Sequence, residues 1–99
     1  MTIEILSTAE DDLVDGYHFY ENQEVGVGDY FLNTMFAEID SLRLYAGTHR
    51  IFWGRYRMLS KTFPFGIFYT INGTSVQVRA VLDLRRHPSW LRRRARRES

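Results

Sequence analysis

Cysteine is absent from this sequence of 99 residues, so neither disulfide bonds nor a thiolate metal site can hold its fold. Its apolar stretches are far shorter than the ~20 residues that cross a bilayer. The first five residues, MTIEI, lack the basic segment and apolar run of a signal peptide. From these absences we expect a soluble, cytoplasmic protein.

Positive charge is absent from the first 42 residues, which contain ten acids and no Lys or Arg. All 13 basic residues lie between Arg43 and Ser99, where the only acids are Asp83 and Glu98. The two parts therefore carry −10 and +11, which sum to the net charge of +1. This asymmetry predicts either a partner selected by charge or complementarity within the fold.

The chain is short enough for a single domain, and 44% hydrophobic residues suffice for one continuous core. We predict a folded domain over residues 1–88 and a basic tail over residues 89–99. The arginine run from Arg92 to Arg97 is either a last helical turn or a disordered tail. Trp90 either anchors this segment to the domain or contributes to a partner site.

The amino-terminal half has the pattern of a strand followed by two helices. Thr2 to Leu6 alternates as a short strand does. Apolar residues at helical spacing predict one helix from Ala9 to Gln23 and a second from Asp29 to Leu42. Few residues join these helices, so we expect an antiparallel hairpin.

The second half contains three β-rich runs, at residues 55–61, 65–71 and 76–84. Asn72-Gly73 between the last two is a strong hairpin signal. Hairpin pairing aligns the odd residues of the 65–71 run with the even residues of the 76–84 run, and both sets are apolar. We therefore predict an α+β fold, strand–helix–helix–strand–strand–strand, with the helices on one face of a mainly antiparallel four-stranded sheet.

The opposite face of this sheet is predicted to be open and rich in arginine, because burying unpaired charge under the helices costs several kcal/mol. We expect this face to bind a large partner. The candidate target-binding residues are Arg57, Lys61, Arg79, Arg85, Arg86 and Trp90.

Several segments, in this order, resemble the RelE/ParE superfamily of toxins from bacterial type II toxin–antitoxin systems. The resemblance spans Ile3 to Pro88 and looks closer to the ParE, plasmid-stabilisation branch. The matching segments are AEDDL at 9–13, FYE at 19–21, GVGDYF at 26–31, FPFGIFY at 63–69 and VRAVLDLRRHP at 78–88.

The resemblance implies a growth-inhibiting toxin that a cognate antitoxin wraps and neutralises in a hetero-oligomer. In the ParE-like branch the target is DNA gyrase, whereas RelE-like members cleave messenger RNA on the ribosome. A third alternative is a degenerate member that only binds its antitoxin or nucleic acid.

If the chain is a metal-independent nuclease, the catalytic candidates are Arg79, Arg85 and His87, which supply cations and a general acid or base. Two departures favour the gyrase alternative. Gly66 aligns where RelE-like nucleases carry an arginine, and the carboxy-terminal segment contains no tyrosine. No cofactor is expected, and His18 with Glu21 lacks the further ligands of a metal site.

Overall fold

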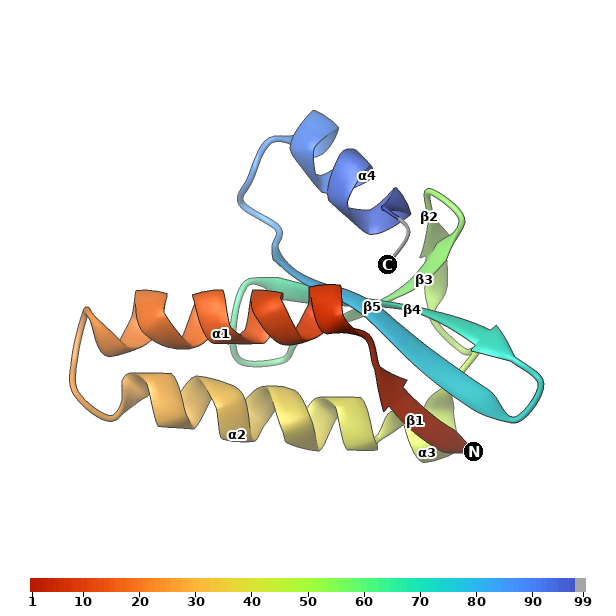
Figure 1. The fold of residues 1–99 in the computed structure, drawn as a ribbon, viewed down its shortest axis with the longest axis horizontal. Coiled ribbons are helices and arrows are strands. Elements are labelled where there is room, and N and C mark those ends of the chain that lie inside the picture. Colours follow the sequence, from red (N-terminus) through yellow and green to blue (C-terminus); the bar gives the residue numbers. More distant parts are fainter. Residues whose placement is uncertain (98–99) are drawn as a thin grey trace.

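The computed structural model describes residues 1–97 as an α+β fold (Figure 1). Two helices, α1 (Ser7–Glu21) and α2 (Val27–Asp40), follow strand β1 (Thr2–Ile5), and the short helix α3 (Leu42–Tyr45) comes next. The remaining elements are β2 (Arg50–Phe52), β3 (Arg55–Leu59), β4 (Phe65–Asn72), β5 (Ser75–Asp83) and α4 (Pro88–Arg96). The predicted fold class and element order are confirmed.

The sheet has five strands in the order β1-β5-β4-β3-β2, one more than the four predicted. Strand β1 pairs in parallel with β5, and the other neighbours are antiparallel. The additional strand β2 has only three residues, too few to show an alternating pattern. Its turn to β3 places Trp53 and Gly54 at positive φ, and a tryptophan there gives no hairpin signal.

Helices α1 and α2 form the expected antiparallel hairpin. They turn at Gly26, whose φ of 94° suits glycine. The Glu21 carboxylate accepts hydrogen bonds from the Gly26 and Gly28 amides at 2.9–3.1 Å, which holds the turn. The helices approach closely at Gly16, where an added Cβ would lie 2.5 Å from the Phe31 ring.

The helical hairpin covers one face of the sheet and forms the main core with it. The side chains of Phe31, Met35 and Leu42 from the helical segment are fully buried there. The sheet contributes the odd residues of β4, as predicted, together with Val76, Val78 and Val81 of β5.

A β-bulge between Phe68 and Tyr69 of β4 changes the alignment of β4 with β5. Tyr69 lies opposite Val78, but Phe68 lies opposite Ala80, so Arg79 is the extra residue. Between Phe65 and Phe68, even residues of β4 pair with even residues of β5. The predicted pairing of odd residues of β4 with even residues of β5 is therefore wrong for this part of the hairpin. Since one extra residue reverses which face the side chains take, Ala80 and Leu82 leave the main core.

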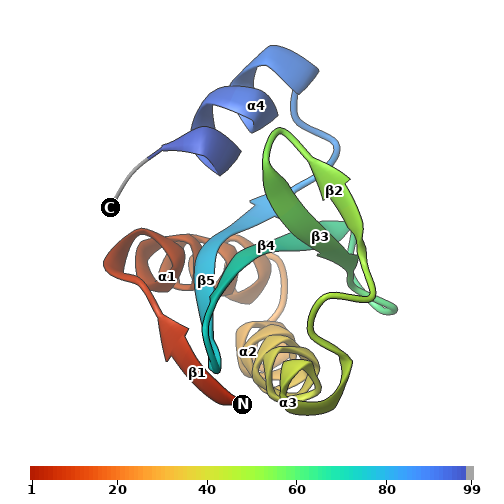
Figure 2. The same cartoon turned by 90° about the vertical axis from the view of Figure 1, so that its right-hand side faces the viewer.

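Helix α4 covers the second face of the sheet, which we had predicted to be open. Leu91 and Ala95 of α4 are buried in a second cluster with Phe68, Ala80 and Leu82. Figure 2 shows α4 on the other side of the sheet from α2. The arginine run is therefore helical through Arg96, since its two apolar residues, four apart, share one helix face.

Candidate functional site

The candidate residues do not form one open surface. Arg57 and Lys61 line a cleft at the outer edge of β3. Arg86 and Trp90 line a smaller pocket where α1, β5 and α4 meet. Arg79, Arg85 and His87 form neither lining, and each has local hydrogen-bond partners.

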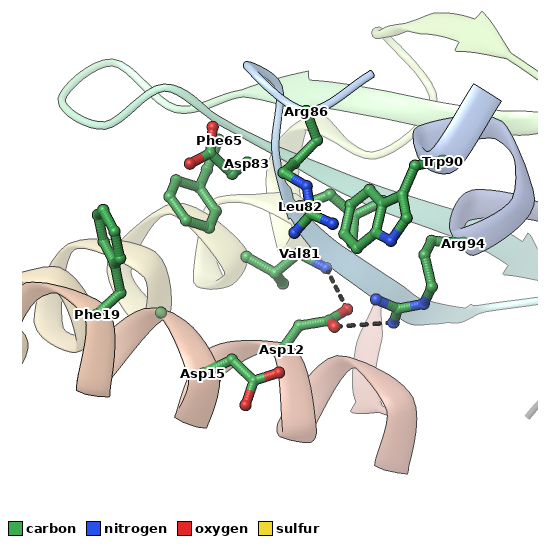
Figure 3. A pocket seen from close by; sticks show the side chains of 11 residues that line it. Asp12, Asp15, Phe19, Phe65, Val81, Leu82, Asp83, Arg86, Trp90 and Arg94 are labelled. Carbon is green, nitrogen blue, oxygen red and sulfur yellow. Dashed lines mark hydrogen bonds and ion pairs between the residues drawn. The ribbon is translucent and has the colours of Figure 1, made fainter. Parts of the chain in front are cut away.

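The smaller pocket has a volume of about 320 Å³ and lies at the base of α4 (Figure 3). It forms because β1 pairs only with Ser75–Val78, which leaves the rest of that β5 edge to α1 and α4. Its walls combine aromatic side chains with charges of both signs. The lining residues are Asp12, Asp15, Gly16, Phe19, Phe65, Val81, Leu82, Asp83, Arg86, Trp90 and Arg94.

Asp12 joins three elements at this pocket. Its carboxylate accepts a hydrogen bond from the Val81 amide at 3.0 Å and pairs with the Arg94 guanidinium at 2.8 Å (Figure 3). Burial raises the pKa of the Asp12 carboxyl above its ordinary value, and these two hydrogen bonds offset part of the rise. Asp12 thus anchors α4 to α1 and β5.

Sequence reasoning missed both Asp12 and Arg94 as partners. The signal for Asp12 was its position, three residues after Ala9 and four before Gly16, on the stripe of α1 that the fold buries. An acid on such a stripe requires a partner. No comparable signal distinguished Arg94 from the neighbouring arginines.

Trp90 lies between two arginines. The Arg86 guanidinium carbon is 3.9 Å from the centre of a Trp90 ring, and that of Arg94 is 5.6 Å away. Cation–π contacts of this kind orient both guanidinium groups around the indole. Arg86 remains exposed at the pocket, and Arg92, Arg93 and Arg96 are exposed on α4, so this helix has a cationic surface.

Arg85 is held by Asp83, two residues earlier, with N–O distances of 2.6–3.3 Å. The hydrogen bonds from Arg85 lower the pKa of the Asp83 carboxyl, and the same pair raises the pKa of Arg85. Because the Arg85 side chain is 58% exposed, the pair contributes at most about 1 kcal/mol to stability. Its guanidinium is already bound to a carboxylate.

His87 caps helix α4. Its Nδ1 accepts a hydrogen bond from the Ser89 amide at 3.1 Å and lies 2.9 Å from the Ser89 hydroxyl. Pro88 then occupies the first turn, where its missing N–H is tolerated. One imidazole nitrogen therefore has a structural role as a helix cap.

Arg79 lies at the bulge on the α4 side of the sheet. Its Nε donates to the Thr70 hydroxyl at 2.8 Å, and its Nη2 donates to Gln77 Oε1 at 3.2 Å. The Arg79 carbonyl accepts a hydrogen bond from the Thr8 hydroxyl at the start of α1. Both its backbone and its side chain therefore stabilise the irregular part of the sheet.

Gly66 is buried and packs against Arg57. An added Cβ would lie 3.1 Å from a Leu84 methyl carbon and 3.2 Å from Cγ of Arg57, closer than ordinary contact. The Arg57 guanidinium covers the Phe52 ring at 3.6 Å. Burial and the neighbouring Arg50 lower the pKa of Arg57. The space of a longer side chain at position 66 is thus occupied by Arg57.

The larger cleft, with a volume of about 750 Å³, lies between the end of the helical segment and strands β2 and β3. Three cationic side chains and one carboxylate line it. The full lining is Ala37, Glu38, Ser41, Tyr45, Thr48, His49, Arg50, Phe52, Arg57, Met58, Leu59 and Lys61. No group of three or more His, Asp or Glu side chains in residues 1–97 is arranged to hold a metal ion.

His49 lines this cleft and contacts the buried Tyr69 behind it. The Tyr69 hydroxyl accepts a hydrogen bond from the Gly47 amide at 3.0 Å and contacts His49 Nδ1. Its proton can therefore point at a neutral imidazole nitrogen. Burial lowers the pKa of His49 below its ordinary value.

We expect the stability of the protein to fall as the pH drops below about 6.5, the ordinary pKa of histidine. Because the pKa of His49 is lower in the folded than in the unfolded protein, its contribution to stability is complete above the unfolded-state pKa. That contribution is lost as the pH falls through the folded-state pKa. Urea unfolding at pH 7.5, 6.5 and 5.5 measures the free energy of unfolding. The variant His49→Gln retains an acceptor for Tyr69 but does not titrate, so an equally steep profile in that variant would contradict the assignment.

Comparison with known proteins identifies the fold. Scans against protein-family models and curated proteins find no match. A search of solved structures finds a chain of the "Chromosomal ParDE TA system from P. aeruginosa" with a TM-score of 0.74 and 15% sequence identity. The alignment covers 82% of this chain and 92% of that chain. At the level of fold, the resemblance found in the sequence is confirmed.

None of the helices within residues 1–97 is long and apolar enough to cross a membrane.

Proposed function

We propose that this chain is the toxin of a type II toxin–antitoxin system, neutralised by a cognate antitoxin and acting on DNA gyrase as ParE-like toxins do. The observation that carries the proposal is the fold shared with a chain of a ParDE system over most of both chains. The cationic residues at α4 and the preceding segment supply a surface for a large acidic target.

Two contacts favour a binder over a messenger RNA endonuclease. Arg85 is bound to Asp83, and His87 Nδ1 caps α4, so two of the three catalytic candidates already have structural partners here. Gly66 also lies against the Arg57 stem, which leaves little room for the arginine that RelE-like nucleases carry there. Stabilising a charged transition state requires groups that are preorganised around the substrate.

Induced expression in bacteria without the antitoxin tests the proposal. We expect growth arrest, inhibition of gyrase supercoiling by the purified protein, and intact transcripts. Coexpression of the cognate antitoxin should restore growth. Normal growth with abundant folded protein would refute toxicity and favour a module that only binds.

The variant His87→Asn separates the two mechanisms. Asparagine is a good helix cap, so it retains the acceptor for the Ser89 amide while removing the imidazole. A gyrase inhibitor should retain its full activity in this variant. A loss of ribosome-dependent transcript cleavage in the same variant would instead establish the nuclease.

Target binding is tested by the double variant Arg85→Gln/Arg86→Gln, with Arg43→Gln as the matched control. Arg43 is similarly exposed and pairs with a carboxylate, but it lies on α3, away from the pocket at α4. We expect about tenfold weaker gyrase inhibition for the double variant and little change for the control. Equal effects would argue against a target surface at these residues.

A further inference from the structure

The larger cleft gathers two arginines around one aromatic ring. Arg50 and Arg57 lie directly opposite each other in the β2–β3 ladder. Both guanidinium carbons lie near the centre of the Phe52 ring, at 5.4 Å for Arg50 and 3.6 Å for Arg57. The ring therefore keeps two like charges close together at the edge of the sheet, and their repulsion costs free energy.

These two charges are not compensated by an acid. Neither Arg50 nor Arg57 has a carboxylate partner within residues 1–97, whereas Arg43, Arg85 and Arg94 each pair with an aspartate. The Nε of Arg57 is buried without a hydrogen-bond acceptor, and the neighbouring Arg50 contributes to lowering the pKa of Arg57. A pair of guanidinium groups with no acid, on the wall of a cleft, has the composition of an anion site.

The donors favour a phosphate monoester over a phosphodiester. Each guanidinium group presents a planar fork that can bind two oxygens. A monoester carries about −1.5 to −2 charges near neutral pH and has three terminal oxygens, whereas an internal linkage of a nucleic acid has fewer of both. Lys61 adds a third cation to the same lining. Two forks and an ammonium group therefore match the monoester better.

The cleft also offers a surface for the remainder of a ligand. Met58 and Leu59 line it with aliphatic side chains, and Tyr45 is 57% exposed. Because Arg57 covers the Phe52 ring, Tyr45 is the aromatic ring on which a planar group can stack. The volume of about 750 Å³ lies within the range of about 300–1,000 Å³ that is usual for small-molecule sites.

We propose that this cleft binds a small phosphate monoester with a planar aromatic body, of which a nucleoside 5′-monophosphate is the simplest example. The phosphate lies between Arg50 and Arg57, and the planar group stacks on Tyr45. The proposal concerns binding alone and does not depend on toxicity or on the target. Ligand binding in vitro and growth arrest in cells are therefore separate results.

Adenosine 5′-monophosphate is the probe, and its binding to the full chain is measured by calorimetry at physiological salt. The variant Arg50→Gln removes an exposed guanidinium group, and Arg92→Gln, an exposed arginine of α4, is its matched control. We expect about tenfold weaker binding for Arg50→Gln and little change for Arg92→Gln. Tyr45→Ala should weaken binding about fivefold, whereas Tyr45→Phe retains the ring and should bind as the wild type does.

Three comparison ligands separate the contributions. Adenosine lacks the phosphate, ribose 5-phosphate lacks the base, and the dinucleoside ApA has only a phosphodiester. All three should bind more weakly than adenosine 5′-monophosphate. Absence of binding by the monophosphate, equal binding by Arg50→Gln, or an equal loss in Arg92→Gln would overturn the proposal. Tighter binding of ApA would overturn it as well, because the cleft would then recognise nucleic-acid linkages.

Discussion

Replacing Asp12 by alanine is expected to lower the free energy of unfolding by about 3–5 kcal/mol. The Asp12 carboxylate has 6% of its surface exposed and its partner Arg94 has 19%, so solvent cannot replace either readily. Removing the acid leaves a largely buried guanidinium without its carboxylate and the Val81 amide without an acceptor. The penalty comes from these orphaned groups, since burial itself disfavours the ionised acid.

Urea unfolding and hydrogen exchange measure this effect. Exchange in α4 should accelerate most, because Asp12 connects that helix to α1 and β5. The control is Asp12→Asn, which retains an oxygen for the Val81 amide and should cost less. A loss below about 1 kcal/mol for Asp12→Ala would contradict the anchoring role of this carboxylate.

Deleting Arg79 is expected to remove the bulge while the protein still folds cooperatively. Arg79 is the extra residue, so without it Val78 and Ala80 follow one another opposite Tyr69 and Phe68. Ala80 and Leu82 stay under α4 and Val81 stays under the helical hairpin, because the alternation of side chains then runs without a break. The deletion loses the Arg79 side-chain bonds and the carbonyl that accepts from Thr8, so we expect the free energy of unfolding to fall by about 1–3 kcal/mol.

The variant Arg79→Ala is the control, since it retains the backbone and the carbonyl that accepts from Thr8. It loses only the side-chain bonds to Thr70 and Gln77 and should cost about 1 kcal/mol. Circular dichroism and thermal melts distinguish the two. Loss of the cooperative melt in the deletion variant would contradict the assignment of Arg79 as the extra residue.

Local patterns were enough to predict the helical hairpin and the β4–β5 hairpin. Apolar residues at helical spacing marked α1 and α2, and Asn72-Gly73 marked the turn. The alternation in the 65–71 run identified the side chains that face the helices, among them Ile67 and Tyr69. These signals operate within a few residues, so no knowledge of distant contacts was needed.

Three features of the site were not predictable in this way. The bulge at Arg79 left no mark, because an arginine in an alternating run looks like any outward residue. Strand β2 was too short to show a period. Four of the nine residues of helix α4 are arginines, and its buried residues Leu91 and Ala95 became meaningful only beside Phe68 and Leu82.

The sequence by itself therefore determined the α+β class, the order of the helical hairpin and the three longer strands after it, and the separation of acidic and basic residues along the chain. Tertiary structure alone decided which charges meet, as Asp12 and Arg94 do across 82 positions of sequence. It also decided that α4 covers the second face of the sheet. The physical reason is that element type follows from short-range periodicity, whereas pairing and burial depend on strand register, and one bulge residue reverses the register.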